Sequence, residues 1–168
     1  MAEVWAGYGG IICIMATGIV VRSIAPLLAD KYGDPAVVVC DELGHFAISL
    51  LSGHLGGANG LAQRVATLIG GQAVLTTASD VLGKTALDLW CRDVGLTPVD
   101  KTGLTRAMGR LVDRGSLRIW SRTPLGKLPE DLVAVVDRSA ADLIVDYRSN
   151  AANHGTLLVP KALVLGVG

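Results

Sequence analysis

The most informative stretch of the chain reads Phe46-Ala-Ile-Ser-Leu-Leu-Ser-Gly-His-Leu-Gly-Gly-Ala-Asn59. Its apolar first half, residues 46–51, is too short for a helix and is typical of a strand. From Ala58 to Ile69 the apolar residues recur largely at helical spacing, and Gly70-Gly71 ends the pattern. The sequence therefore predicts a strand, a glycine-rich loop and a helix in succession.

The glycine-rich loop, residues 52–59, has two interpretations. Gly53, Gly56 and Gly57 could serve only to let the helix pack tightly on the sheet. The backbone N–H groups of Leu55 to Gly57, at the positive end of the helix, also favour an anion or a developing oxyanion. His54 adds a titratable side chain to this loop.

Composition narrows the class of protein. The chain has 168 residues and no net charge, so bulk electrostatics attracts neither nucleic acid nor an anionic membrane. The apolar run Gly9–Val21 is too short to span a membrane, and Glu3 stands where a signal peptide would carry Lys or Arg. We expect a soluble, cytoplasmic protein.

The order of elements predicts the fold class. Buried strands are expected at Gly10–Met15 and Ala36–Cys40, and the segment 36–51 is expected to form a hairpin. A helix is expected over Ile19–Lys31, with Pro26 interrupting it, and a further strand at 72–76. This alternation indicates an α/β fold with a parallel-rich open sheet and helices on both faces.

The character of the sequence changes near residue 84. Helices are expected at 85–94 and 104–114, and short strands near 117–120, 133–136 and 143–145. This pattern predicts a second, smaller α/β domain with no evident catalytic constellation. The segment Pro160–Gly168 reads like the start of a further strand. Three distant cysteines, two of them in apolar strands, predict reduced buried thiols at Cys13 and Cys40 and no metal site.

Four segments carry a resemblance to a known family: Met15–Leu28, Asp34–Glu42, Ile48–Asn59 and Thr76–Asp80. Together they closely resemble the amino-terminal domain of the cobalt-precorrin-5A hydrolases, the CbiG family of anaerobic cobalamin biosynthesis. The resemblance implies an amino-terminal α/β domain over 1–82 that lacks its first strand-helix unit. It also implies a central α/β domain over 83–160 and the start of a carboxy-terminal domain at 161–168. We therefore expect a piece of a longer protein.

The resemblance implies a hydrolase. Its substrate is cobalt-precorrin-5A, whose δ-lactone is opened and whose extruded two-carbon unit leaves as acetaldehyde, giving cobalt-precorrin-5B. No cofactor and no protein-held metal are implied, because the substrate carries the cobalt. The expected partner is the cobalt-corrinoid substrate, with no nucleic acid and no membrane. A homodimer and contacts with other enzymes of the cobalamin pathway stay open.

Lactone hydrolysis needs a base for water, donors for the oxyanion and an acid for the leaving alkoxide. The catalytic candidates are His54, which could be base or acid, and Asp41 and Glu42, which follow a buried strand. Each of the three also has a structural interpretation: His54 could cap the helix, and Asp41 and Glu42 could belong to a solvated turn. The expected substrate-binding residues are Arg22, Thr17, Gly18, Ser52, Gly53, Gly56, Gly57 and Asn59. We expect His54, Arg22 and the acidic pair to face one cleft. A nucleophilic Ser52 is not favoured, because no G-x-S-x-G motif is present.

Two other functions remain in view. A non-catalytic corrinoid-binding or scaffold module would bind the substrate and release no acetaldehyde. A generic phosphate- or nucleotide-binding domain is disfavoured, because both the G-x-G-x-x-G and the G-K-[ST] patterns are absent.

Overall fold

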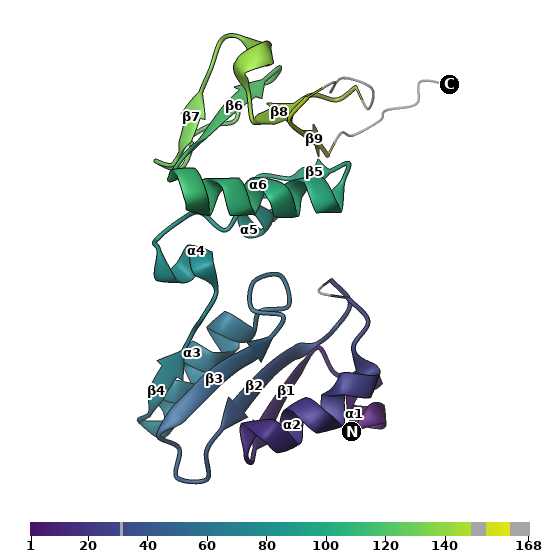
Figure 1. The fold of residues 1–168 in the computed structure, drawn as a ribbon, viewed down its shortest axis with the longest axis vertical. Helices are drawn as coiled ribbons and strands as arrows, with labels where there is room; N and C mark the ends of the chain where they lie inside the picture. The colour runs from purple at the N-terminus through teal and green to yellow at the C-terminus, as the bar shows by residue number, and fades with distance from the viewer. Residues whose placement is uncertain (31, 149–153, 162–168) are drawn as a thin grey trace, which may run out of the picture. The chain divides into compact units, whose positions relative to one another are not determined.

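The computed structural model describes residues 1–30, 32–148 and 154–161. The chain divides into two compact units, Met1–Thr77 and Ala78–Gly168, and each contains one sheet. Figure 1 shows helices packed against both sheets, as the alternating pattern predicts. Among the described residues, no helix is long and apolar enough to cross a membrane.

The first unit has a four-stranded mixed sheet in the order β1-β2-β3-β4. β1 runs parallel to β2 and β3 parallel to β4, whereas β2 and β3 form the predicted antiparallel hairpin. The elements of this unit are α1 (Ala2–Gly7), β1 (Gly10–Ile14), α2 (Thr17–Ile24), η1 (Ala25–Leu27), β2 (Ala36–Cys40), β3 (Phe46–Leu51), α3 (Ala58–Ile69) and β4 (Gln72–Val74).

Both faces of the first sheet are covered at its central strand β2, whose five residues are all buried. Val37 and Val39 point toward α2, while Val38 and Cys40 lie in the core beneath α3. α2 and α3 lie on opposite sides of the sheet (Figure 1). The predicted arrangement of helices on both faces is confirmed for this unit.

The helix expected over Ile19–Lys31 is shorter than predicted. α2 ends at Ile24 and a 3₁₀ turn, η1, follows. Pro26 explains the early end, because proline has no N–H to donate to the carbonyl four residues before it.

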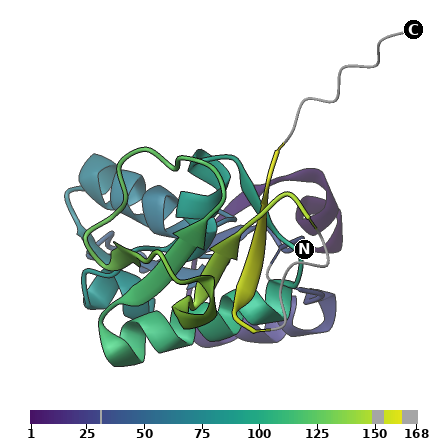
Figure 2. The same cartoon turned by 90° about the horizontal axis from the view of Figure 1, so that it is seen from above.

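The second unit has a five-stranded sheet in the order β5-β9-β8-β6-β7. β6, β8 and β9 run in the same direction, which Figure 2 shows. Among the strands that the structure describes in this sheet, only the edge strand β5 is antiparallel to its neighbour. Its elements are α4 (Ala78–Val81), α5 (Leu87–Asp93), β5 (Leu96–Pro98), α6 (Lys101–Arg114), β6 (Leu117–Ser121), β7 (Leu132–Ala134), η2 (Arg138–Ala140), β8 (Leu143–Val145) and β9 (Thr156–Pro160).

The α/β class of the second unit is confirmed. Its sheet has five strands against four in the first unit. Residues from α5 and α6 pack with alternate strand residues such as Leu143 and Leu158 in its main core. The predicted carboxy-terminal start at 161–168 lies almost wholly outside the described residues.

The three cysteines are free and buried, as the sequence predicts for Cys13 and Cys40. Burial raises the pKa of the Cys91 thiol to about 12. Burial also raises the pKa of the Cys13 and Cys40 thiols above the usual value, so all three residues are thiols at neutral pH.

Candidate functional site

The glycine-rich loop follows the carboxyl end of β3 and leads directly into α3, as predicted. Three backbone hydrogen bonds close it: Gly57 N–H donates to the His54 carbonyl at 2.9 Å, Ala58 N–H to Ser52 at 3.1 Å and Asn59 N–H to Gly53 at 3.0 Å. The chain therefore turns tightly, and these three N–H groups already have acceptors.

Steric contacts explain the glycines. A Cβ on Gly53 would lie 2.7 Å from Oδ1 of Asn59, and a Cβ on Gly56 would meet the Ser52 Cβ and lie 2.7 Å from the Ser52 carbonyl oxygen. Gly57 has a φ of 86°, in the left-handed region that favours glycine. Packing thus requires each of the three glycines for a separate reason.

Ser52 is held in an unusual conformation. Its φ of 57° is the one positive φ of a non-glycine residue in the described part of the chain. Its hydroxyl donates to the carbonyl of Asp34 at 2.9 Å. Because that bond ties the hydroxyl to the loop before β2, a nucleophilic serine is not favoured here either.

Asn59 is the polar hub of the loop. It is buried in the first turn of α3, where its Oδ1 accepts from Ser49 Oγ at 2.6 Å and its Nδ2 donates to Thr77 Oγ1 at 3.0 Å. These bonds join the loop to β3 and to the segment after β4. Neither Ser49 nor Thr77 was predicted as a site residue, although the threonine pair 76–77 at the end of a strand was a usable signal.

His54 lies in the turn of the loop, partly exposed, with its carbonyl held by Gly57 N–H. The N–H groups of Leu55 and Gly56 donate to no backbone acceptor within the described ranges. The predicted oxyanion site of Leu55 to Gly57 is therefore reduced to two donors. In chemical terms, an imidazole can move a proton and N–H donors can stabilise a developing oxyanion, and residues 54–56 supply both kinds of group in succession along the chain.

The other predicted residues lie at the opposite edge of the sheet. There, a cavity of about 340 Å³ is lined by Thr17, Asp41 and Glu42 together with apolar side chains that include Phe46 and Ile48. Gly18 and Arg22 belong to the same helix as Thr17, and Arg22 is exposed with its guanidinium close to Gly18.

Asp41 is engaged by the hairpin turn. Its carboxylate accepts from the Phe46 N–H at 2.7 Å and lies 3.4 Å from Nδ1 of His45. The Phe46 hydrogen bond is the main cause that lowers the pKa of this carboxyl below its usual value. These contacts account for Asp41 as a turn residue and make it a weaker base.

The expectation of one cleft for His54, Arg22 and the acidic pair is wrong. In the hairpin, Cys40 faces Ala47 and Val37 faces Leu51, so Asp41 and the glycine-rich loop lie at opposite ends of the strands. At roughly 3.3 Å per residue, the six residues of β3 separate them by about 20 Å. In Figure 1 the hairpin turn is at the lower end of this sheet and the loop at its upper end.

No group of three or more His, Cys, Asp or Glu side chains that could hold a metal ion occurs among residues 1–30, 32–148 and 154–161.

The second unit carries an ion pair that the sequence did not reveal. The buried carboxylate of Asp146 accepts from Arg122 Nε at 3.0 Å and from its second guanidinium nitrogen at 3.1 Å. They follow the neighbouring parallel strands β8 and β6.

Comparison with known proteins shows what the chain is similar to. Residues 1–80 match the family model described as cobalamin synthesis G N-terminal. The cobalt-precorrin-5A hydrolase of Salmonella typhimurium is 36% identical over 99% of this chain and 51% of its own length. That of Priestia megaterium is 34% identical over 100% of this chain and 50% of its own. The chain thus spans about half the length of these relatives.

A solved structure of a cobalamin biosynthesis protein G homologue from Sulfolobus solfataricus has the same fold. It superimposes with a TM-score of 0.53 at 18% identity, covering 95% of this chain and 48% of that one. Residues 1–80 are therefore similar to the family described as cobalamin synthesis G N-terminal, and the whole chain is similar to about half of each of two cobalt-precorrin-5A hydrolases.

Proposed function

We propose that this chain takes part in the hydrolysis of cobalt-precorrin-5A in anaerobic cobalamin biosynthesis. The observation that carries the proposal is its similarity to two cobalt-precorrin-5A hydrolases along its entire length. The glycine-rich loop supplies the chemical support, because it presents a histidine and two N–H donors at one strand end.

In the proposed reaction His54 first accepts a proton from water. The hydroxide adds to the lactone carbonyl, and the N–H groups of Leu55 and Gly56 stabilise the negative oxygen. The tetrahedral intermediate collapses by breaking the ring C–O bond, and the imidazolium returns its proton to the leaving alkoxide. The lactone thus becomes a carboxylic acid and a free hydroxyl.

Release of acetaldehyde follows from that hydroxyl. A base removes the hydroxyl proton, the oxygen forms a carbonyl as the adjacent C–C bond breaks, and the electron pair of that bond passes into the conjugated macrocycle, which takes up one proton. These steps use proton transfer and hydrogen bonding, and the cobalt arrives with the substrate. Asp41 and Glu42, at the other edge of the sheet, have no part in this version.

The cellular setting follows from the same proposal. A biosynthetic enzyme of this kind works in the cytoplasm, on a substrate that neither nucleic acid nor a membrane presents. Assembly as a homodimer and contacts with other enzymes of the pathway stay predictions.

The test is a single-turnover assay with cobalt-precorrin-5A that follows acetaldehyde. It uses this chain alone and this chain fused in place of the corresponding half of the Salmonella typhimurium hydrolase. His54→Ala should lower turnover by about 10²-fold or more, because general acid–base assistance acts in the transition state. His45→Ala is the matched control, since His45 is an exposed histidine of the same unit in the hairpin turn.

Three outcomes separate the alternatives. Loss of turnover in His54→Ala, with turnover kept in His45→Ala and corrinoid binding unchanged in both, supports the proposal. Corrinoid binding without acetaldehyde from either unmutated form selects the binding module instead. Turnover of His54→Ala within a few-fold of the unmutated protein, at equal folded fraction, would show that the imidazole is not the acid or base.

A further inference from the structure

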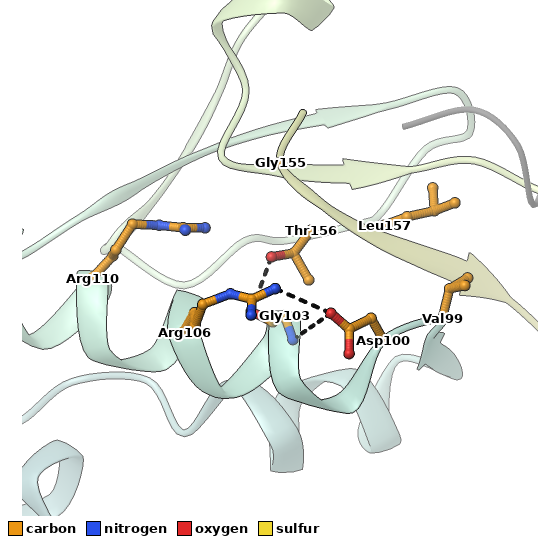
Figure 3. Close-up of a pocket in the computed structure, with 8 residues that line it drawn as sticks. All are labelled: Val99, Asp100, Gly103, Arg106, Arg110, Gly155, Thr156 and Leu157. Atoms are coloured by element: carbon orange, nitrogen blue, oxygen red, sulfur yellow. Dashed lines mark hydrogen bonds and ion pairs between the residues drawn. The ribbon is translucent and has the colours of Figure 1, made fainter. Parts of the chain in front are cut away.

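The second unit contains a cavity of about 390 Å³ that no step of the proposed reaction uses. It lies between α6 and β9, beside Val99, and Figure 3 shows its lining. Among its lining residues are Val99, Asp100, Gly103, Arg106, Arg110 and Thr156. All of them belong to the second unit, so the cavity is complete within it.

Two arginine side chains from one face of α6 line this cavity. Arg106 and Arg110 are four residues apart on α6, which puts them on the same side of the helix. In Figure 3 both side chains extend from α6 over the same side of the helix as Thr156. A pair of forked donors facing one space is suited to a planar carboxylate.

Their existing partners do not satisfy them. Nε of Arg110 is buried and has no hydrogen-bond partner. Arg106 pairs with Asp100 at 3.2 Å, but both side chains are more than half exposed, so this ion pair contributes little. A bound anion would therefore gain contacts without breaking a strong one.

The surroundings of Asp100 favour a singly charged anion. Asp100 already accepts from the N–H groups of Thr102 and Gly103, the donors that a phosphate at the start of α6 would need. Its charge offsets one of the two arginines, which leaves the lining with one net positive charge. A carboxylate matches that charge better than a phosphate dianion does.

The charge of the chain is also unevenly divided. Of its fifteen Lys and Arg residues, three lie within residues 1–77 and twelve within 78–168. The same two segments hold five and ten Asp and Glu residues, so the net charge is −2 over residues 1–77 and +2 over residues 78–168. The second unit is therefore the one whose net charge favours an anionic ligand.

We propose that Arg106 and Arg110 form a carboxylate-binding site in this cavity. The assignment of its ligand as an acetate or propionate side chain of the corrinoid rests on the proposed function. The site itself stands on the two arginines and the cavity.

Binding to the full chain tests the site directly. Backbone amide spectra are recorded with glutarate, a short dicarboxylate, and with inorganic phosphate. Glutarate should shift the amide signals of Gly103, Gly155 and Thr156, and phosphate at equal concentration should shift them less. No saturable shift with glutarate, or equal binding of phosphate at these amides, would overturn the proposal.

The variants use cobyrinic acid, a corrin with several free carboxylates, whose visible absorption reports binding. The double variant R106Q/R110Q should bind glutarate and cobyrinic acid at least tenfold more weakly. Arg92→Gln is the matched control, because Arg92 is exposed and pairs with its neighbour Asp93. Unchanged affinity of the double variant for glutarate, with its amide spectrum otherwise intact, would refute the site.

Further results distinguish the carboxylate site, its assignment to the corrinoid and the proposed function. Arg110→Lys keeps the positive charge but replaces the planar guanidinium by an ammonium group, so its affinity for glutarate should be intermediate. This variant also provides a test if the double variant does not fold. Glutarate binding that depends on the arginines, with cobyrinic acid binding that does not, leaves the carboxylate site in place and removes the corrinoid assignment. Failure of the turnover assay with both ligands still bound would count against the proposed function alone.

Discussion

Asn59→Ala tests whether the glycine-rich loop owes its shape to one buried amide. The side chain is 8% exposed, accepts a 2.6 Å hydrogen bond from Ser49 and donates a 3.0 Å bond to Thr77. Its removal therefore unties α3 from β3 and from the end of β4 at the same time.

The expected loss follows from these contacts. Two hydrogen bonds at about 1 kcal/mol each, and a partly buried Ser49 hydroxyl left with fewer partners, give about 2.5 kcal/mol. The better helix propensity of Ala returns about 0.5 kcal/mol. The net expectation is a destabilisation of the first unit by about 2 kcal/mol. Gln63→Ala, an exposed substitution on the same helix, should change stability by less than about 0.5 kcal/mol.

Native-state hydrogen exchange, read by mass spectrometry, measures the effect in each unit separately. Since 1.4 kcal/mol is a factor of ten, protection over residues 46–69 should fall about 30-fold in Asn59→Ala. Protection of α6, residues 101–114, should not change, because its core does not include the first unit. A change of less than threefold over 46–69, or an equal change over both segments, would refute the role of Asn59 as the hub.

Two further predictions concern steric fit and charge. Gly56→Ala should destabilise the first unit by about 1–3 kcal/mol, because its Cβ would collide with the backbone of Ser52. Gly60 lies in α3, and a Cβ added there would meet no atom within 4 Å, so Gly60→Ala should instead stabilise the first unit by about 0.5–1 kcal/mol. Urea titrations with a spectroscopic probe in this unit would compare the two variants. The hydrogen bond from Arg122 is the main cause that lowers the pKa of Asp146. The ionised Asp146 carboxylate therefore stabilises the fold above its unfolded pKa of about 4, and this stabilisation is lost as the pH falls through the lower folded pKa. Asp146→Asn should lower the Tm of the second unit at pH 7 and flatten its dependence on pH below 4; the same acid sensitivity in the variant and the parent would contradict this.

Most of the first unit could be predicted from the sequence because its signals are local. The hairpin over 36–51, the loop at 52–59 and the helix after it depend on the order of apolar and glycine residues along a short segment. The prediction was wrong at Pro26, where the backbone changes to a 3₁₀ turn, so α2 ends at Ile24 and not at the predicted residue 31. The glycines were read correctly as a strand-to-helix loop, but only the structure shows what each one would touch.

The candidate site shows the limit of that reasoning. His54 and Asp41 both follow strands, and in a wholly parallel sheet both would reach the same edge. The antiparallel turn between β2 and β3 puts them about 20 Å apart instead. The expectation of a hairpin was already contained in the sequence analysis, so the single cleft conflicted with another prediction made from the same residues.

The sequence by itself determined the α/β class, the glycine-rich loop and its histidine, because residue type and spacing control backbone conformation over a few residues. Only the tertiary structure decided which side chains meet. Asn59 and Thr77 are eighteen residues apart, and Thr156 reaches Gly103 across fifty-three. Contacts at such separations depend on sheet order and strand direction, which no local pattern specifies. For that reason the arginine cavity between α6 and β9 had no sequence signal, whereas the loop before α3 did.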